Sequence, residues 1–247
     1  NHLHGGPAGL FSKVWRAESC GETGVTFSCE SPDGEEGFPG NMRVSVTYTL
    51  EGSALRLAYR AESDKVTVCN LTNHGYFNLN GHDAHGAMEQ VLALYAQSYT
   101  PVIPGSIPTG EIVPVEGTPM DFRTPRVIGE RIGEAFRQLE LCSGYDHNWV
   151  VDGETGKLRP AALLESPKTG IRMTVETTLP GIQFYAGNYM DGCPAGKGGA
   201  QYGRRDAVCL ETQFFPDTPN HPDFPQCVLR PGQVWSHETV FRFSRVD

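Results

Sequence analysis

The residue with the clearest chemical signal is a glutamate inside an apolar segment. Glu211 lies in Ala207-Val-Cys-Leu-Glu-Thr-Gln-Phe-Phe-Pro216, which has the pattern of a strand. Burial disfavours the charged form of a carboxylate, so its pKa would rise toward the range of a general base. Alternatively, Glu211 stands at a strand end with its side chain in water. The pattern alone leaves both interpretations open.

A histidine is the second candidate for acid–base chemistry. His74 lies in Asn70-Leu-Thr-Asn-His-Gly-Tyr-Phe-Asn-Leu-Asn80, where polar residues are interspersed with leucines and aromatic residues. Because imidazole titrates near neutral pH, His74 could serve as a general acid. The alternative is a turn histidine that hydrogen-bonds backbone carbonyls.

Asp146 offers a second carboxylate beside an apolar strand. It lies in Gly144-Tyr-Asp-His-Asn-Trp-Val-Val151. A buried carboxylate is costly unless it accepts several hydrogen bonds. Asp146 therefore either caps a local turn or binds the hydroxyl groups of a ligand.

Two histidines stand two residues apart near the start of the chain, in Asn1-His-Leu-His-Gly-Gly6. On a strand, His2 and His4 would point to the same side, and paired imidazoles suit a metal ion. No third ligand is local. The alternative is that one histidine hydrogen-bonds in a core while the other is solvated.

The elements that position these residues are predicted to be strands. Apolar and polar residues alternate in five segments, as expected for antiparallel strands with one covered face. A turn at Glu51-Gly52-Ser53 makes a hairpin of the first two segments. The segments are 43–50, 55–59, 171–176, 182–186 and 238–243.

Helix is expected in one place only. Residues 126–141 have apolar residues at near-helical spacing, although Gly129 and Gly133 weaken the pattern. Six prolines between Tyr99 and Pro125 predict extended, loop-rich structure there. With 29 glycines and 18 prolines spread over 247 residues, we expect residues 1–247 to form a single all-β domain, either a sandwich or a larger arrangement of strands.

Charge and cysteine content exclude several classes of protein. The formal net charge is -9 and no basic cluster is present, so nucleic acid is not expected as a partner. No apolar run is long enough for a membrane helix. The seven cysteines are scattered and without a CxxC pair, so we expect reduced thiols and a cytoplasmic protein.

Together the candidates comprise histidines, two carboxylates, amide side chains and many aromatic residues. Aromatic faces and paired polar groups suit a sugar, which has apolar C–H faces and a ring of hydroxyls. The sequence contains no phosphate-binding loop, dinucleotide fingerprint or GxSxG motif. The residue pattern therefore predicts a β-domain with an acid–base site.

Several longer motifs make the chain resemble the aldose 1-epimerase family. They occur in the order typical of that family and cover nearly the whole sequence. They are Asn1-His-Leu-His-Gly-Gly6, Asn73-His-Gly-Tyr-Phe-Asn-Leu79, Ile107-Pro-Thr-Gly-Glu-Ile112, Gly117-Thr-Pro-Met-Asp-Phe122, Tyr145-Asp-His-Asn-Trp149, Gly181-Ile-Gln-Phe-Tyr-Ala-Gly-Asn188 and Cys209-Leu-Glu-Thr-Gln213.

The resemblance implies an all-β fold, a large antiparallel β-sandwich with very little helix. It also implies a mutarotase that interconverts the α and β anomers of free aldoses such as galactose or glucose. By the same resemblance Glu211 is the base, His74 is the acid, and His4, Asp146 and Gln183 hold the sugar hydroxyls. Neither a cofactor nor a metal is implied. We expect an aldose as the partner and a monomer or weak dimer.

The family also has a section before the first of these motifs, with sheet strands and a substrate-binding arginine. This sequence begins at that motif, so we expect those N-terminal strands and the arginine to be missing from the chain. The alternative function is a non-catalytic sugar-binding or regulatory module on the same fold.

Overall fold

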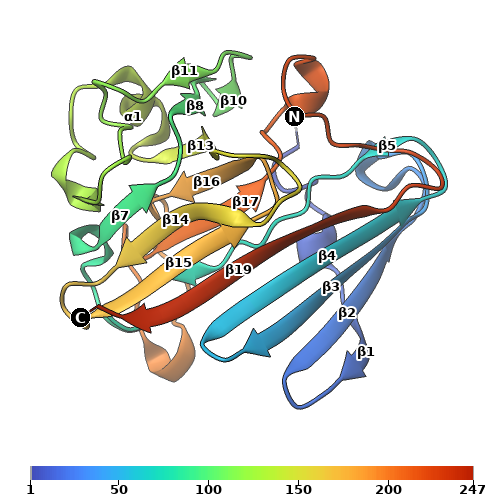
Figure 1. The fold of residues 1–247 in the computed structure, drawn as a ribbon, viewed down its shortest axis with the longest axis horizontal. Coiled ribbons are helices and arrows are strands. Elements are labelled where there is room, and N and C mark those ends of the chain that lie inside the picture. Colours follow the sequence, from blue (N-terminus) through green and yellow to red (C-terminus); the bar gives the residue numbers. More distant parts are fainter. Residues whose placement is uncertain (1, 247) are drawn as a thin grey trace.

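The structure, a computed structural model, describes residues 2–246. Antiparallel strands account for most of its regular structure and form two main sheets (Figure 1). The larger sheet has nine strands, in the spatial order β1 (Arg16–Cys20), β2 (Gly24–Ser31), β3 (Met42–Glu51), β4 (Ala54–Ser63), β19 (Trp235–Arg245), β15 (Ile171–Thr177), β14 (Arg159–Glu165), β7 (Val91–Leu94) and β12 (Arg126–Val127).

The second sheet packs against one part of the first. Its six strands are, in spatial order, β11 (Val113–Pro114), β8 (Ser98–Thr100), β13 (Asp146–Val150), β16 (Gly181–Tyr185), β17 (Val208–Gln213) and β6 (Tyr76–Phe77). Two small two-stranded sheets pair β9 (Val102–Ile103) with β10 (Ile107–Pro108) and β5 (Thr67–Val68) with β18 (Val228–Leu229). This arrangement confirms the predicted antiparallel β-sandwich.

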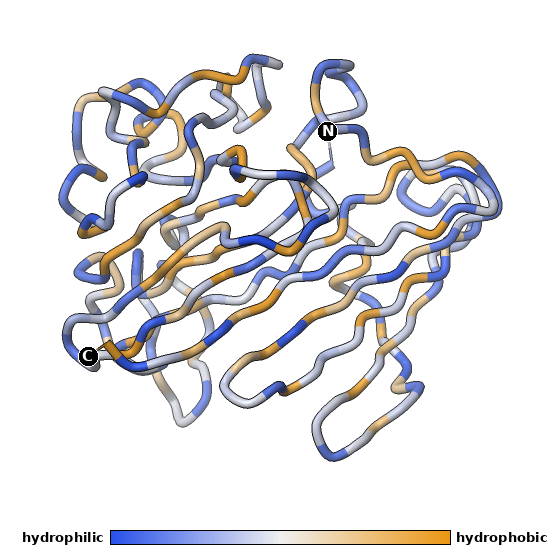
Figure 2. Tube along the Cα trace, in the orientation of Figure 1, coloured by the Kyte–Doolittle hydropathy of each residue, from blue (hydrophilic) through white to orange (hydrophobic). Residues whose placement is uncertain are grey.

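The hairpin predicted from the alternating pattern is β3 and β4. Glu51 pairs with Ala54 across the turn, where Gly52 has a φ of 61°. Hydrophilic and hydrophobic residues alternate along both strands (Figure 2), and Val44, Val46, Leu57 and Tyr59 of the apolar set belong to the hydrophobic core. Leu50 departs from the prediction, since it is 58% exposed beside the turn.

The predicted helix over residues 126–141 is mostly wrong. The α-helix α1 covers Arg137–Cys142 alone, because Arg126 pairs with Leu92 in the large sheet and Gly129 packs closely on Met88. Elsewhere in residues 2–246, helix is limited to three-residue 3-10 turns: η1 (Leu10–Ser12), η2 (Glu35–Gly37), η3 (Ala87–Glu89), η4 (Ile128–Glu130), η5 (Lys197–Gly199) and η6 (Thr218–Asn220). None of these described helices is long and apolar enough to cross a bilayer.

The hydrophobic core lies between the two sheets. Phe77 of β6 meets Phe241 of β19 with ring centroids 4.9 Å apart, and the hydroxyls of Thr212 and Thr239 hydrogen-bond across the same gap. Aromatic rings dominate the middle of the core, where each contributes a large buried area. The fully buried aromatic residues are Trp149, Tyr145, Phe122, Phe184, Phe215 and Phe241. This packing holds the six-stranded sheet rigidly by one face.

Candidate active site

Strand pairing gathers polar residues on the outer face of the six-stranded sheet. Gln183 of β16 lies opposite Glu211 of β17 on one side and Asn148 of β13 on the other. Asp146 lies opposite Tyr185, one row along the same face. Paired residues share a face and successive residues alternate between faces. We call this surface the polar face, defined by Asp146, Asn148, Gln183, Tyr185, Cys209, Glu211 and Gln213.

The amide side chains of the polar face form a hydrogen-bonded chain. Gln213 Nε2 donates to Gln183 Oε1 at 3.1 Å and to Asn148 Oδ1 at 3.3 Å. Gln183 Nε2 in turn donates to Asp146 Oδ1 at 2.8 Å. Such networks fix the orientation of each member, because a buried polar group left without a partner is costly. The network therefore presents Gln183 and Asp146 in a defined arrangement.

His74 reaches this face from the loop between β5 and β6. The amide of Asn70 holds the loop against β17 by hydrogen bonds to both the N–H and the carbonyl of Phe214, at 2.8 and 2.9 Å. Asn73 donates to the hydroxyl of Tyr59 at 3.1 Å. The result places His74 Nε2 3.5 Å from Glu211 Oε1. The two proposed acid–base groups thus face each other.

Aromatic rings surround the imidazole of His74. Tyr76 stacks on it with centroids 5.0 Å apart and an interplanar angle of 22°, while 51% of Tyr76 remains exposed. His4 stands perpendicular to it at 5.3 Å, and Tyr185 contacts it edge-on at 6.2 Å. These neighbours restrict the ring and leave an open side beside it.

Burial sets the electrostatics of the two candidate acid–base groups, Glu211 and His74. Loss of hydration raises the pKa of Glu211 to about 8, and the charge of Asp146 acts in the same direction. Burial also raises the pKa of Asp146, although the hydrogen bond from Gln183 opposes this. For His74, burial and the proximity of His4 lower the pKa below its usual range. Perturbed groups that face each other are typical of active sites.

The structure brings together the five residues predicted for the site and removes two alternatives. Glu211 is inside β17 and 6% exposed, so the strand-end position in water is wrong. Asp146 is the first residue of β13, and its carboxylate accepts the hydrogen bond from Gln183 rather than capping a turn.

The prediction that His2 and His4 share one side of a strand is wrong. They lie in a series of turns in which His4 has a φ of 57°. His2 packs against Phe38 at 5.3 Å, whereas His4 packs against His74. The left-handed conformation of His4 turns the two imidazoles toward different neighbours.

Sequence reasoning missed three residues that build the site. Gln213 and Asn148 complete the amide network, and Tyr76 stacks on His74. The period-two pattern contained a signal for Gln213, because Cys209, Glu211 and Gln213 are two residues apart along one strand and therefore share a face. No local pattern pointed to Asn148 or Tyr76, whose roles depend on neighbouring strands.

Among the described residues, one group of three side chains has the separation needed to hold a metal ion: His74, Cys209 and Glu211, with ligand atoms within 4.8 Å of one another.

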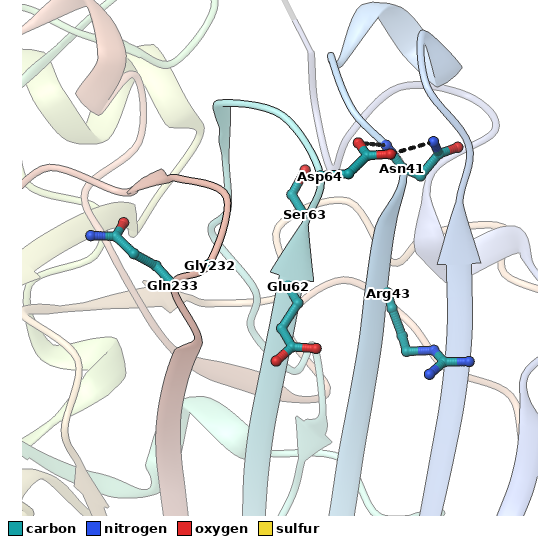
Figure 3. A pocket seen from close by; sticks show the side chains of 7 residues that line it. All are labelled: Asn41, Arg43, Glu62, Ser63, Asp64, Gly232 and Gln233. Atoms are coloured by element: carbon teal, nitrogen blue, oxygen red, sulfur yellow. Dashed lines mark hydrogen bonds between the residues drawn. The ribbon is translucent and has the colours of Figure 1, made fainter.

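A separate hollow lies where β3 begins and β4 ends (Figure 3). None of the seven residues that line it belongs to the six-stranded sheet, and Asn41 uses both its N–H and its amide to hydrogen-bond Asp64. It is therefore separate from the candidate site.

Comparisons with known proteins agree with this geometry. The family model described as aldose 1-epimerase matches residues 1–242. The galactose mutarotase of Homo sapiens is 43% identical over 244 residues, which cover 99% of this chain and 69% of that protein. The aldose 1-epimerase of Escherichia coli (strain K12) is 37% identical over 246 residues, covering 98% of this chain and 70% of that protein.

Two solved structures share the fold over the full length of the chain. An aldose epimerase homologue from C. elegans superposes with a TM-score of 0.88 at 32% identity, covering 100% of this chain and 73% of that one. A galactose 1-epimerase from Lactobacillus acidophilus NCFM gives a TM-score of 0.84 at 30% identity, covering 100% and 70%. The similarity thus includes both sheets and therefore the strands that carry the polar face.

Proposed function

This chain belongs to the aldose 1-epimerase family, and from that premise we propose that Glu211 and His74 exchange protons with a free aldose held on the polar face. The enzyme is an isomerase that interconverts the α and β anomers of aldoses. The observation that carries the residue assignment is the His74–Glu211 contact at 3.5 Å beside a hydrogen-bonded set of hydroxyl-binding groups. We propose galactose or glucose as the sugar.

The reaction needs two proton transfers at neighbouring oxygens. Glu211 removes the proton of the C1 hydroxyl, the C1–O1 bond becomes a carbonyl, and the bond between C1 and the ring oxygen breaks. His74 delivers a proton to the ring oxygen as that bond breaks. Rotation about the C1–C2 bond presents the other carbonyl face, and the same two groups reverse their roles when the ring closes.

The acid–base pair carries one proton throughout this cycle. Before ring opening the proton is on His74, and afterwards it is on Glu211. The raised pKa of Glu211 and the lowered pKa of His74 move the shared proton toward Glu211, which is the reverse of the order in water, where the carboxylate is the stronger acid. They favour the protonation state of the pair that ring opening leaves and from which ring closure starts.

The remaining polar residues orient the sugar. Asp146 accepts hydrogen bonds from hydroxyls, and Gln183 both accepts and donates, so the pair suits two adjacent hydroxyl groups. His4 lies beside His74 at 5.3 Å, near the position that we assign to the ring oxygen. The half-exposed ring of Tyr76 offers an apolar surface to the C–H groups of the sugar.

We also propose that residues 1–247 act as a single domain. Strand β19 pairs with β4 from the first part of the chain and with β15 from the second part. The two parts therefore contribute to one continuous sheet, and a break between them would expose the core.

Polarimetry of freshly dissolved α-D-galactose tests the proposed function. The purified chain should shorten the approach to the equilibrium rotation, and α-D-glucose measured in parallel ranks the two sugars. A rate equal to the spontaneous rate, with thermal stabilisation by the sugar, would favour the non-catalytic sugar-binding module.

For the role of His74, we expect His74→Ala to reduce kcat by roughly 10²–10⁴, and near-normal turnover would refute that role.

A further inference from the structure

A buried thiol lies beside the acid–base pair and has no part in the proton transfers. Cys209 and Glu211 are two residues apart on β17 and therefore share the polar face. The sulfur of Cys209, a nitrogen of His74 and a carboxylate oxygen of Glu211 all lie within 4.8 Å of one another. The thiol belongs to a strand held by the core, whereas His74 comes from the loop clamped by Asn70.

The spacing of these atoms is close to that of a tetrahedral metal site. Zinc binds imidazole nitrogen and carboxylate oxygen at about 2.0–2.2 Å, so two such ligands in a tetrahedron are roughly 3.4 Å apart. His74 Nε2 and Glu211 Oε1 are already 3.5 Å apart. A thiolate binds at about 2.3 Å, so the sulfur needs to approach the other two atoms by roughly 1.2 Å at most. Rotation about the Cα–Cβ bond of Cys209 is the side-chain motion that would bring the sulfur closer.

The chemistry of the three groups selects a soft or borderline divalent cation. Thiolate and imidazole favour zinc and cadmium over magnesium and calcium, which prefer oxygen ligands. A thiolate and a carboxylate together neutralise a charge of +2, which reduces the cost of holding the ion in a buried place. With three protein ligands, a fourth position remains for water.

Binding requires the thiol of Cys209 to lose its proton. The positive charge of the ion favours the thiolate, and the proton is released as the ion binds.

We propose that His74, Cys209 and Glu211 form a binding site for one Zn²⁺ or Cd²⁺ ion, and that occupation of this site blocks the isomerase by engaging its acid–base pair. The blocking effect rests on the proposed function, whereas the binding does not. The ion competes with the sugar because both require the same nitrogen and the same carboxylate.

A cadmium titration followed in the ultraviolet tests the site directly. Cadmium thiolates absorb by charge transfer from sulfur to metal, so the signal reports ligation by a cysteine. Because Cys20 and Cys193 are exposed, the titration uses the purified full chain with both replaced by serine. We expect the band to saturate at one equivalent, with a higher Tm in the presence of cadmium.

Matched cysteine variants assign the signal. In the same background, Cys209→Ser should abolish the band and weaken cadmium binding roughly 10–100-fold, as loss of an anionic ligand requires. The control is Cys227→Ser, which removes another buried thiol and should leave the titration unchanged. If Cys209→Ser does not fold, Glu211→Gln provides the decisive variant, because it keeps the thiol and should still weaken binding by a similar factor.

Polarimetry with and without the ion tests the inhibition. Metal-free enzyme should lose activity as cadmium is added and recover it with a chelator, while Cys209→Ser should need roughly 10–100-fold more cadmium for the same loss relative to its own metal-free rate. The proposed site would be overturned if saturating cadmium produced no charge-transfer band. It would also be overturned if the band persisted in Cys209→Ser. Full activity at a saturated band would overturn the blocking effect. If the metal-free chain does not accelerate anomerisation, the proposed function is refuted. The cadmium titration would still test the metal site in that case.

Discussion

The two faces of β17 are equally buried but differ in what burial does to them. Leu210 is fully buried on the core face, and the adjacent Glu211 is only 6% exposed on the polar face. Removing Leu210 from water stabilises the fold. Removing Glu211 from water disfavours its charged form and raises its pKa to about 8. Burial of the core face thus stabilises the fold, whereas burial of Glu211 on the polar face costs stability and changes the pKa of its carboxylate.

This difference extends across the whole six-stranded sheet. The core face carries Trp149, Ile182 and Phe184, which interlock with the large sheet. The polar face carries amides and carboxylates that contact each other through the network centred on Gln183. Rigidity on the core face therefore fixes the geometry on the polar face. Substitutions on the two faces should separate stability from activity.

The largest effect is expected for Glu211→Gln. The amide has nearly the same shape but cannot accept a proton from the sugar, so kcat should fall by roughly 10²–10⁴. Because the folded-state pKa of Glu211 is raised, its ionisation destabilises the fold at a pH above the unfolded value, and this penalty is complete above about pH 8. The variant should thus be at least as stable as wild type at pH 9. Polarimetry at pH 7 measures kcat, and thermal unfolding at pH 9 measures stability. Lower stability together with retained kcat would contradict the comparison of faces.

Phe184→Ala tests the core face of the neighbouring strand. Phe184 stacks on Tyr145 at 5.3 Å and contacts Phe122 at 5.7 Å. Loss of this buried ring should lower the free energy of unfolding by about 3–5 kcal/mol. Below the unfolding transition, kcat should stay within a few-fold of wild type. Urea unfolding gives the stability, with Ile182→Val as a milder control expected to cost about 0.5–1.5 kcal/mol.

A smaller effect is expected for Gln213→Ala, beside Glu211 on the polar face. It removes the donor to Gln183 and Asn148, so Gln183 is less well oriented and KM should rise about 5–30-fold, with kcat changing less. The matched control is Thr212→Val on the core face, which loses the hydroxyl contact with Thr239. That variant should lose about 1 kcal/mol of stability and keep its KM. An equal KM for both variants would show that the amide network does not orient the sugar.

The smallest effect is a displacement of the pH profile. The active pair holds one proton, so kcat/KM should fall above about pH 8 as Glu211 ionises and fall at acid pH as the pair gains a second proton at the lowered pKa of His74. Asp146→Asn removes the secondary cause of the raised Glu211 pKa, so the alkaline limb should move to lower pH. Burial, the larger cause, remains, so this displacement should be modest. An alkaline limb that stays in place would exclude Asp146 as a source of the shift.

Site residues with an unusual local pattern could be predicted from the sequence, whereas those that depend on partners far away in the chain could not. Glu211 stood out because a charge inside an apolar strand conflicts with its local pattern. Asn148 gave no such signal, since its role depends on Gln213 from another strand. The predicted helix at 126–141 was mostly wrong for a related reason: pairing of Arg126 with Leu92 outweighed a weak local helical pattern.

The sequence by itself determined which residues share a face of each strand, because side-chain alternation is a local property of extended backbone. It thus placed Cys209 and Glu211 on one side, and its motifs pointed to the family. Only the tertiary structure decided that this side gathers the residues of the polar face and that His74 meets Glu211 at 3.5 Å. Strand pairing and loop clamping join segments far apart in the chain, and these depend on how the whole core packs rather than on any local pattern.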